Sequence, residues 1–227
     1  MAYSSMTASL QSLGSSLTYG LGASDRDRIA LAYSLTSAQR VARSAASDPT
    51  SLAYFDAMSA QLVELGWVQW WSTQVDNAAL GAADAGATNT EEWIGTSWSP
   101  ALLTSARAIE QSWHALGAAV AKSPDAQALM DAWWPCTEIA LSVRHMCIGP
   151  LVAIAGTPAV VLGAVNVRGQ IETWRQLFLP DSDVHYTGCA VGLSLDTAVY
   201  ASHAPALEAS LRDEVESSIR HTQLDLD

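Results

Sequence analysis

A run of 22 residues without a formally charged side chain, at positions 146–167, constrains this sequence more than any other feature. Basic side chains flank the run, with Arg144 and His145 before it and Arg168 after it. An uninterrupted stretch of about 18 or more apolar residues is typical of a transmembrane helix. The run must therefore either cross a membrane or fill the core of the protein.

Residues that disfavour a helix decide between these readings. They interrupt the run at Gly149, Pro150, Gly156, Pro158 and Gly163. An interior proline costs a helix about 3 kcal/mol and each glycine about 1 kcal/mol relative to alanine. The turn sequence at 156–158 separates residues 151–155 from the valine-rich residues 159–167, so we predict two buried strands, or one strand beside an extended loop. The alternatives are a buried, kinked helix, a single membrane-spanning helix, and a membrane-inserting hairpin that oligomerises to close its edges.

The membrane-inserting hairpin predicts which residues would make the contact. If the hairpin enters a membrane or joins a second copy, its large apolar side chains make the contact. These are Leu151, Val152, Ile154, Val160, Val161 and Leu162.

Charge excludes one class of function. The chain has 227 residues, 23 of them acidic and 11 basic, for a net charge of -12. No basic stripe is present to neutralise phosphates, so nucleic acid is excluded as a partner. Electrostatic attraction to anionic lipid is disfavoured for the same reason, so any membrane contact would be apolar or lipid-specific.

Cysteine use and the first residues bear on location. The three cysteines, Cys136, Cys147 and Cys189, are an odd number, which argues against a disulfide framework. The first residues lack the basic and apolar regions of a secretory signal. We therefore predict cytoplasmic synthesis, with signal-independent export as the alternative. Lys122 is the only lysine among the basic residues, a bias that indicates a GC-rich bacterial genome.

The first part of the chain has helical patterns. We expect the Ser/Gly-rich residues 1–23 to be a mobile arm. Ser24 is a good N-cap for a helix that reaches about Ala46, and a second helix is expected over 51–75. Ser99-Pro100 and Ser123-Pro124 open a third and a fourth helix, the last ending near Trp134.

After Pro135 the period of the pattern changes from helical to two. Residues 138–147 alternate and predict a strand, and residues 184–195 predict another. Residues 171–179 are expected to form a strand or a short helix. A closing helix is expected over 205–221.

Helices that precede strands indicate an α+β protein rather than an alternating α/β protein. We predict an N-terminal helical layer of about four helices, then a mostly antiparallel β-meander, then a C-terminal helix. The expected divisions are the arm at 1–23, a helical region at 24–135 and a β-rich region with its closing helix at 136–227, or a single composite domain.

Tryptophan is over-represented, with nine against two phenylalanines. Trp67, Trp70 and Trp71 have i, i+3, i+4 spacing and would share one face of the second helix. Most tryptophans are expected to wedge the helices onto the sheet. The alternative for these three is an exposed platform that binds a sugar, a protein partner or a lipid interface.

One set of residues has the chemistry of a metal site. Asp181, Asp183 and His185 alternate, so in an extended segment their side chains share a face and suit zinc, manganese or calcium. The alternative is a solvated turn, since turns are rich in aspartate. His145 and Cys147 are expected to be buried in the core, and no known catalytic motif surrounds Cys189.

Two functions from different classes follow. The first is a non-enzymatic binding or assembly protein without a cofactor. Its ligand would be a protein partner or a second copy of the chain. One form of this hypothesis is a membrane-active bacterial toxin component that oligomerises. The second is a small metal-dependent hydrolase built on the Asp-x-Asp-x-His residues.

Overall fold

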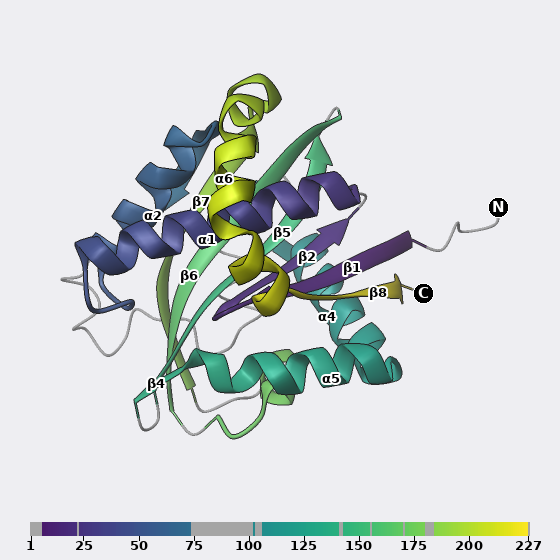
Figure 1. Ribbon diagram of the computed structural model, residues 1–227. Helices are drawn as coiled ribbons and strands as arrows, with labels where there is room; N and C mark the ends of the chain where they lie inside the picture. The colour runs from purple at the N-terminus through teal and green to yellow at the C-terminus, as the bar shows by residue number, and fades with distance from the viewer. Residues whose placement is uncertain are drawn as a thin grey trace.

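A computed structural model of the protein describes residues 6–21, 23–73, 102, 106–140, 143–154, 156–169, 171–179 and 184–226. In this part of the chain one eight-stranded sheet lies between two groups of helices (Figure 1). The elements, labelled as in the figure, are β1 (Met6–Leu13), β2 (Ser16–Leu21), α1 (Asp25–Ala45), α2 (Leu52–Glu64), β3 (Trp67–Thr73), α4 (Ala106–Lys122), α5 (Pro124–Trp133), η2 (Trp134–Thr137), β4 (Glu138–Ala140), β5 (Val143–Ile154), β6 (Thr157–Gly169), η3 (Trp174–Phe178), β7 (Val184–Leu195), α6 (Thr197–Ser218) and β8 (Arg220–Leu226).

The strand order of the sheet is β3-β7-β6-β5-β2-β1-β8, and the short β4 pairs with β5. Strands β5, β6 and β7 form an antiparallel meander, and β3 adds to it antiparallel to β7. The hairpin of β1 and β2 joins through a parallel β2–β5 pair. Strand β8 pairs with β1, so the first and last described strands of the chain lie side by side (Figure 1).

The uncharged run forms the two central strands β5 and β6. Their hairpin closes at Ile154 and Thr157, and Gly156 between them has a φ of +82°, which favours glycine. Helices cover both faces of these strands, so their apolar residues point into two cores instead of one. A strand buried on both faces has a continuous apolar sequence rather than an alternating one. The prediction of two buried strands joined by a turn is confirmed, but Thr157 and Pro158 belong to β6 rather than to the turn.

The mixed helix-and-sheet class is confirmed, but the predicted layer of about four N-terminal helices is wrong. Three strands, β1, β2 and β3, precede Pro135 along with the helices, and the sheet takes strands from both sides of that residue. Most of the expected mobile arm at 1–23 is the β1–β2 hairpin. Ala8 and Leu10 enter one core while Ser9 and Gln11 point to the opposite face under α1, so the segment has period two in polarity.

The second predicted helix is shorter than expected because of Gly66. The α2 helix ends at Glu64, and Gly66 follows with a φ of +96°. A Cβ at this position would lie 3.0 Å from the backbone nitrogen of Tyr200, and the carbonyl of Gly66 accepts a hydrogen bond from the amide of Asp196. The left-handed turn stops the helix and sends the chain back as strand β3.

Two other boundaries differ from the sequence prediction. The closing helix α6 starts at Thr197 rather than near Pro205, because the side chain of Asp196 accepts hydrogen bonds from the amides of Ala198 and Val199. Residues 171–179 contain the short 3-10 helix η3, so the second of the two expected alternatives, a short helix, is the one present. The end of the predicted helix at 221 belongs to β8.

Each face of the sheet has its own core. Helices α4 and α5 with η3 cover one face, and α1, α2 and α6 cover the other (Figure 1). Trp113 is fully buried in the first core, where its indole Nε1 donates to the carbonyl of Leu177 at 3.1 Å and its ring stacks on Phe178. Trp113 thus anchors α4 to η3 in this core.

Candidate functional site

The three clustered tryptophans lie on strand β3, not on a helix. The prediction that Trp67, Trp70 and Trp71 share a helical face is therefore wrong. Trp67 is fully buried in the core under α2, whereas Trp71 packs against the opposite core. Trp70 is 40% exposed. The segment provides one buried anchor and two rings on the other side of the sheet.

A β-bulge causes this distribution. Gln69 pairs with Leu193 and Trp71 pairs with Gly192, so Trp70 is an extra residue in β3. Residues 69 and 72 would point to opposite faces of a regular strand. The extra residue shifts the alternation, so the side chains of Gln69 and Ser72 both face α2.

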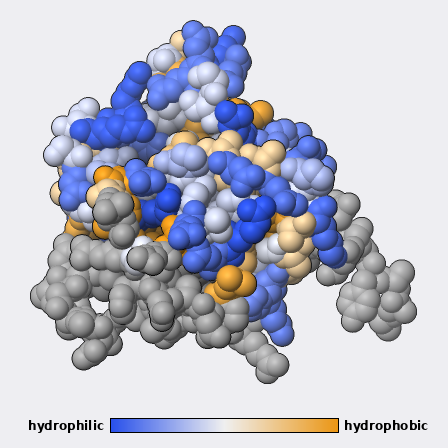
Figure 2. Space-filling view, turned by 90° about the horizontal axis from the view of Figure 1, so that it is seen from below, coloured by the Kyte–Doolittle hydropathy of each residue, from blue (hydrophilic) through white to orange (hydrophobic). Residues whose placement is uncertain are grey.

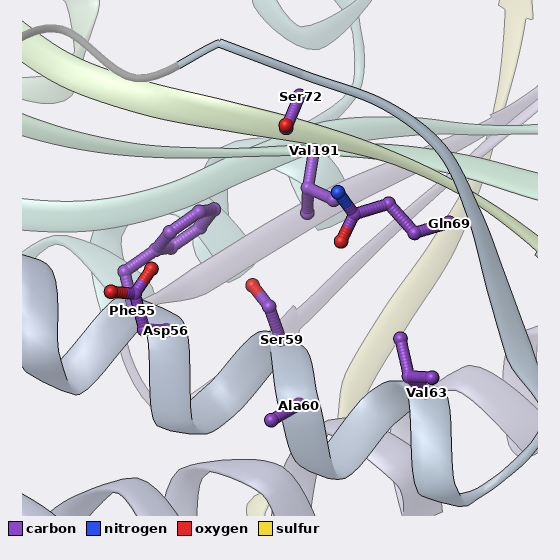
Figure 3. A pocket seen from close by; sticks show the side chains of 8 residues that line it. All are labelled: Phe55, Asp56, Ser59, Ala60, Val63, Gln69, Ser72 and Val191. Carbon is purple, nitrogen blue, oxygen red and sulfur yellow. The ribbon is translucent and has the colours of Figure 1, made fainter.

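These two side chains border a groove between α2, β3 and β7. Its volume is about 350 Å³. Figure 3 shows the side chains that line it. Helix α2 supplies most of the lining through one stripe of residues, and Val191 of β7 forms the floor. The lining residues are Phe55, Asp56, Ser59, Ala60, Val63, Gln69, Ser72 and Val191.

The groove exists because the middle of the α2 stripe is small. Phe55, Ser59 and Val63 follow one another at i, i+4 and i+8 along one face of the helix. Ser59 and its neighbour Ala60 are too short to reach the sheet, while Phe55 and Val63 close the two ends (Figure 3). A volume of about 300 Å³ or more is within the range of small-molecule sites.

Two polar side chains of the groove are placed to meet a ligand, Ser59 and Asp56. The hydroxyl of Ser59 is shielded from water, and no hydrogen-bond partner for it lies in the described part of the chain. In Figure 3 this hydroxyl points into the groove towards Val191 and Gln69. Asp56 is exposed at the rim and forms no ion pair with any described basic residue. Buried polar groups normally have partners, so the hydroxyl of Ser59 suits a bound ligand.

A second, smaller cavity of about 30 Å³ adjoins Phe55 from the other side. His145 lies there, with its Nδ1 at 2.8 Å from Oδ1 of Asn166 on the neighbouring strand. The amide nitrogen of Asn166 donates to the carbonyl of Thr50 at 3.3 Å. This chain of hydrogen bonds fastens the α1–α2 connection to the sheet. Burial lowers the pKa of His145 and keeps it neutral, an effect that Asn166 and Asp48 partly oppose.

The buried thiols are poor nucleophiles. Burial raises the pKa of Cys189 to about 12, and the neighbouring Cys147 and Asp56 add to this shift. Burial also raises the pKa of Cys147 to about 12. Since the thiolate is the reactive form, neither cysteine is prepared for covalent catalysis. His145 and Cys147 are core residues, as predicted from the sequence.

The six candidate membrane or assembly residues lie on β5 and β6. Four are almost completely buried: Leu151, Val160, Val161 and Leu162. Val152 is partly buried, and Ile154, at the hairpin end, is 49% exposed. No described helix has the length and apolar character that a membrane crossing needs. Contact of the four buried side chains with lipid would require the sheet to open.

The metal-site prediction falls mostly outside the described residues. Asp181 and Asp183 are not among them, and His185 is on β7, paired with Arg168 of β6. Within the described residues, no three histidine, cysteine, aspartate or glutamate side chains come together in a way that would hold a metal ion.

The surface seen in Figure 2 is mostly hydrophilic where it is described, with apolar residues in separate small patches. The largest exposed apolar side chains come from several elements and include Ile29, Val68 and Ile154. Scattered apolar residues are normal on a protein surface, so no broad apolar face is present in this view.

Comparisons with protein-family models, with curated proteins and with solved structures find no match to this chain. The groove is therefore the feature of the molecule that points to a function. Sequence reasoning missed this groove because its residues combine two elements and a bulge. One sequence signal could have indicated the groove. The small residues Ser59 and Ala60 lie between Phe55 and Val63 on a predicted helix, next to a tryptophan-rich segment.

Proposed function

We propose that the protein is a non-enzymatic binding protein and that its ligand occupies the groove between α2 and β3. The observation that carries this proposal is the hydroxyl of Ser59, which points into a groove of about 350 Å³ without a partner. A ligand atom in the groove would complete this hydrogen bond. The apolar side chains of Phe55 and Val191 would cover the remainder of the ligand.

The composition of the lining supports binding rather than catalysis. Among the described residues, Asp56 is the one ionisable side chain that lines the groove. General acid–base or nucleophilic chemistry usually needs a second group within hydrogen-bond reach of the first. Cys189 is close enough to Asp56 for their charges to interact, but burial keeps its thiol protonated.

A groove-filling variant tests the proposal. Nile red, a neutral apolar dye, is titrated into the wild-type protein, Ala60→Trp and Ala53→Trp. Ala60 lines the groove, whereas Ala53 is exposed on the same helix outside the lining. The expected result is a blue-shifted dye emission with wild type and Ala53→Trp that is lost in Ala60→Trp. Equal dye binding by Ala60→Trp and wild type would remove the groove as the binding site.

The other predicted functions stay predictions. Self-association is consistent with binding and is checked by sedimentation velocity over a range of protein concentrations. Membrane activity needs the buried β5–β6 hairpin to leave the sheet. Cytoplasmic synthesis and signal-independent export are proposals that fractionation of producing cells would test.

A further inference from the structure

The groove has polarity along its length. Asp56 lies at one end of the α2 stripe and Val63 at the other, seven residues further on. At a rise of about 1.5 Å per residue, these positions are about 10 Å apart. One end therefore offers a carboxylate and the other an aliphatic side chain, with Ser59 between them.

We propose that the ligand of this groove is a small organic cation about 10 Å long, with an apolar body and one ammonium or guanidinium group. This inference rests on the proposed binding function and names its ligand class. The apolar body lies between Val63 and Val191, and the cation reaches the carboxylate of Asp56. The hydroxyl of Ser59 and the amide oxygen of Gln69 accept further hydrogen bonds from the ligand.

Charge complementarity selects a cation. The carboxylate of Asp56 is an acceptor without a basic partner among the described residues. The chain carries a net charge of -12, which lowers the local concentration of anions and raises that of cations around the groove. An anionic ligand would place a second negative charge beside Asp56.

The shape of β3 favours a small molecule over an added peptide strand. An extended peptide would have to pair with a regular row of backbone groups along the strand. The bulge at Trp70 interrupts that row in the middle of β3. Bulges of this kind protect strand edges from pairing with other chains. The groove above the strand, by contrast, is bounded by side chains from three elements.

Three probes with the same phenyl ring and aliphatic chain test the ligand class. They are phenylbutylamine, phenylbutanol and phenylbutyrate, measured by calorimetry and by displacement of Nile red. An exposed ion pair is worth at most about 1 kcal/mol, so the amine is expected to bind about fivefold more tightly than the alcohol. The carboxylate is expected to bind more weakly than the alcohol.

Matched variants test whether the charge of Asp56 causes the preference for the amine over the alcohol. Asp56→Asn is expected to bind the amine and the alcohol equally, whereas Glu64→Gln, on an exposed part of the same helix outside the lining, keeps the wild-type preference. The preference should also shrink between about 0.01 M and about 1 M salt, over which the Debye length falls from about 30 Å to about 3 Å.

The outcomes separate the two proposals. If Nile red binding depends on the groove but amine and alcohol bind alike, the cation inference is overturned and the binding function stands. If Ala60→Trp binds Nile red as wild type does, both are overturned. If a peptide of alternating valine and lysine displaces Nile red but phenylbutylamine does not, the ligand is a strand rather than a small molecule, and the inference is again overturned.

Discussion

The indole of Trp70 lies directly over the backbone of Gly192 on the neighbouring strand. A Cβ atom at Gly192 would come within 2.8 Å of Cε2 of that ring. The two residues sit at the bulge, where Trp70 and Trp71 both lie opposite Gly192. The missing side chain on β7 therefore makes room for the extra tryptophan on β3, and the same bulge turns Gln69 and Ser72 towards the groove.

Adding a methyl group at Gly192 is expected to displace the Trp70 ring. We expect Gly192→Ala to lower the free energy of unfolding by about 1–3 kcal/mol, the usual cost of overpacking. Urea denaturation of wild type, both single variants and the double variant Trp70→Ala/Gly192→Ala measures this coupling. A cost of Gly192→Ala that is unchanged in the Trp70→Ala background would show that the ring is not the obstacle.

The hydroxyl of Ser59 is expected to contribute nothing to folding. It is shielded from solvent and has no partner in the described chain, so Ser59→Ala should leave the free energy of unfolding unchanged or raise it. The control is Ser51→Ala on the same helix, because Ser51 caps α2 by accepting from the amide of Tyr54 at 3.2 Å. Loss of that cap should cost about 1 kcal/mol.

Chemical denaturation of the two serine variants gives the comparison. A clear loss of stability in Ser59→Ala would mean that the hydroxyl has a structural partner. Weaker binding of phenylbutylamine by a stable Ser59→Ala protein would instead assign the hydroxyl to the ligand.

Acidification is expected to destabilise the protein through His145. Burial lowers the pKa of its imidazole below 6.5, so between the folded and unfolded pKa values the unfolded chain binds more protons. The stability contributed by neutral His145 is complete above the unfolded pKa and is lost as the pH falls through it towards the folded value. Each pKa unit between the folded and unfolded values of His145 changes the free energy of unfolding by about 1.4 kcal/mol.

Unfolding measured from about pH 7.5 to about pH 5 checks this effect against a variant. His145→Gln should show a smaller loss of stability over this interval than wild type. His203→Gln is the control, since His203 is exposed on α6. Identical slopes for wild type and His145→Gln would contradict the assignment.

The three thiols should differ in reactivity. Cys136 is exposed, whereas Cys147 is buried and Cys189 is partly buried, with both of their pKa values raised to about 12. Titration with a chromogenic disulfide should therefore modify one cysteine rapidly in the native protein and all three after denaturation. Rapid native labelling that persists in Cys136→Ser would show that one of the other thiols becomes accessible.

The folded protein is not expected to permeabilise membranes. Leu151, Val160 and Val161 are nearly inaccessible to solvent, and each contributes roughly 1.5–3 kcal/mol to folding by its burial. Dye-filled neutral and anionic liposomes should therefore retain their contents, and tryptophan emission should not shift to the blue. Leakage under native conditions would show that the hairpin leaves the sheet and would revive the toxin hypothesis.

Local patterns allowed much of the fold to be predicted. The cap at Ser24, the proline start at Pro124 and the breakers at 156–158 each determine the backbone within a few residues, and the structure has the corresponding helices and turn. Continuous apolar sequence after residue 146 correctly indicated buried strands, and the structure shows that helices cover both of their faces. Such signals need no knowledge of distant contacts.

Other features depend on contacts that spacing does not reveal. Trp67 and Trp71 fit a helix by spacing, but Gly66 turns the chain beside Tyr200, far along the sequence, and the segment becomes a strand. The segment with polar Ser9 and Gln11 was predicted to be a mobile arm because the sequence does not show that helix α1 covers these side chains. The groove was hidden for the same reason, since its position depends on the bulge opposite Gly192.

The pairing of β1 with β8 has a consequence for the order of folding. Met6 lies opposite Leu226, so this ladder closes nearly the whole chain into a loop. A growing polypeptide that leaves the ribosome with β1 first keeps the outer edge of that strand unpaired until β8 emerges. Ladders between such distant segments slow folding, and an open edge invites association with other chains. A chaperone that shields β1 during synthesis is therefore expected to raise the yield of native protein more than one that acts on the β5–β6 hairpin, whose two strands follow one another in the sequence.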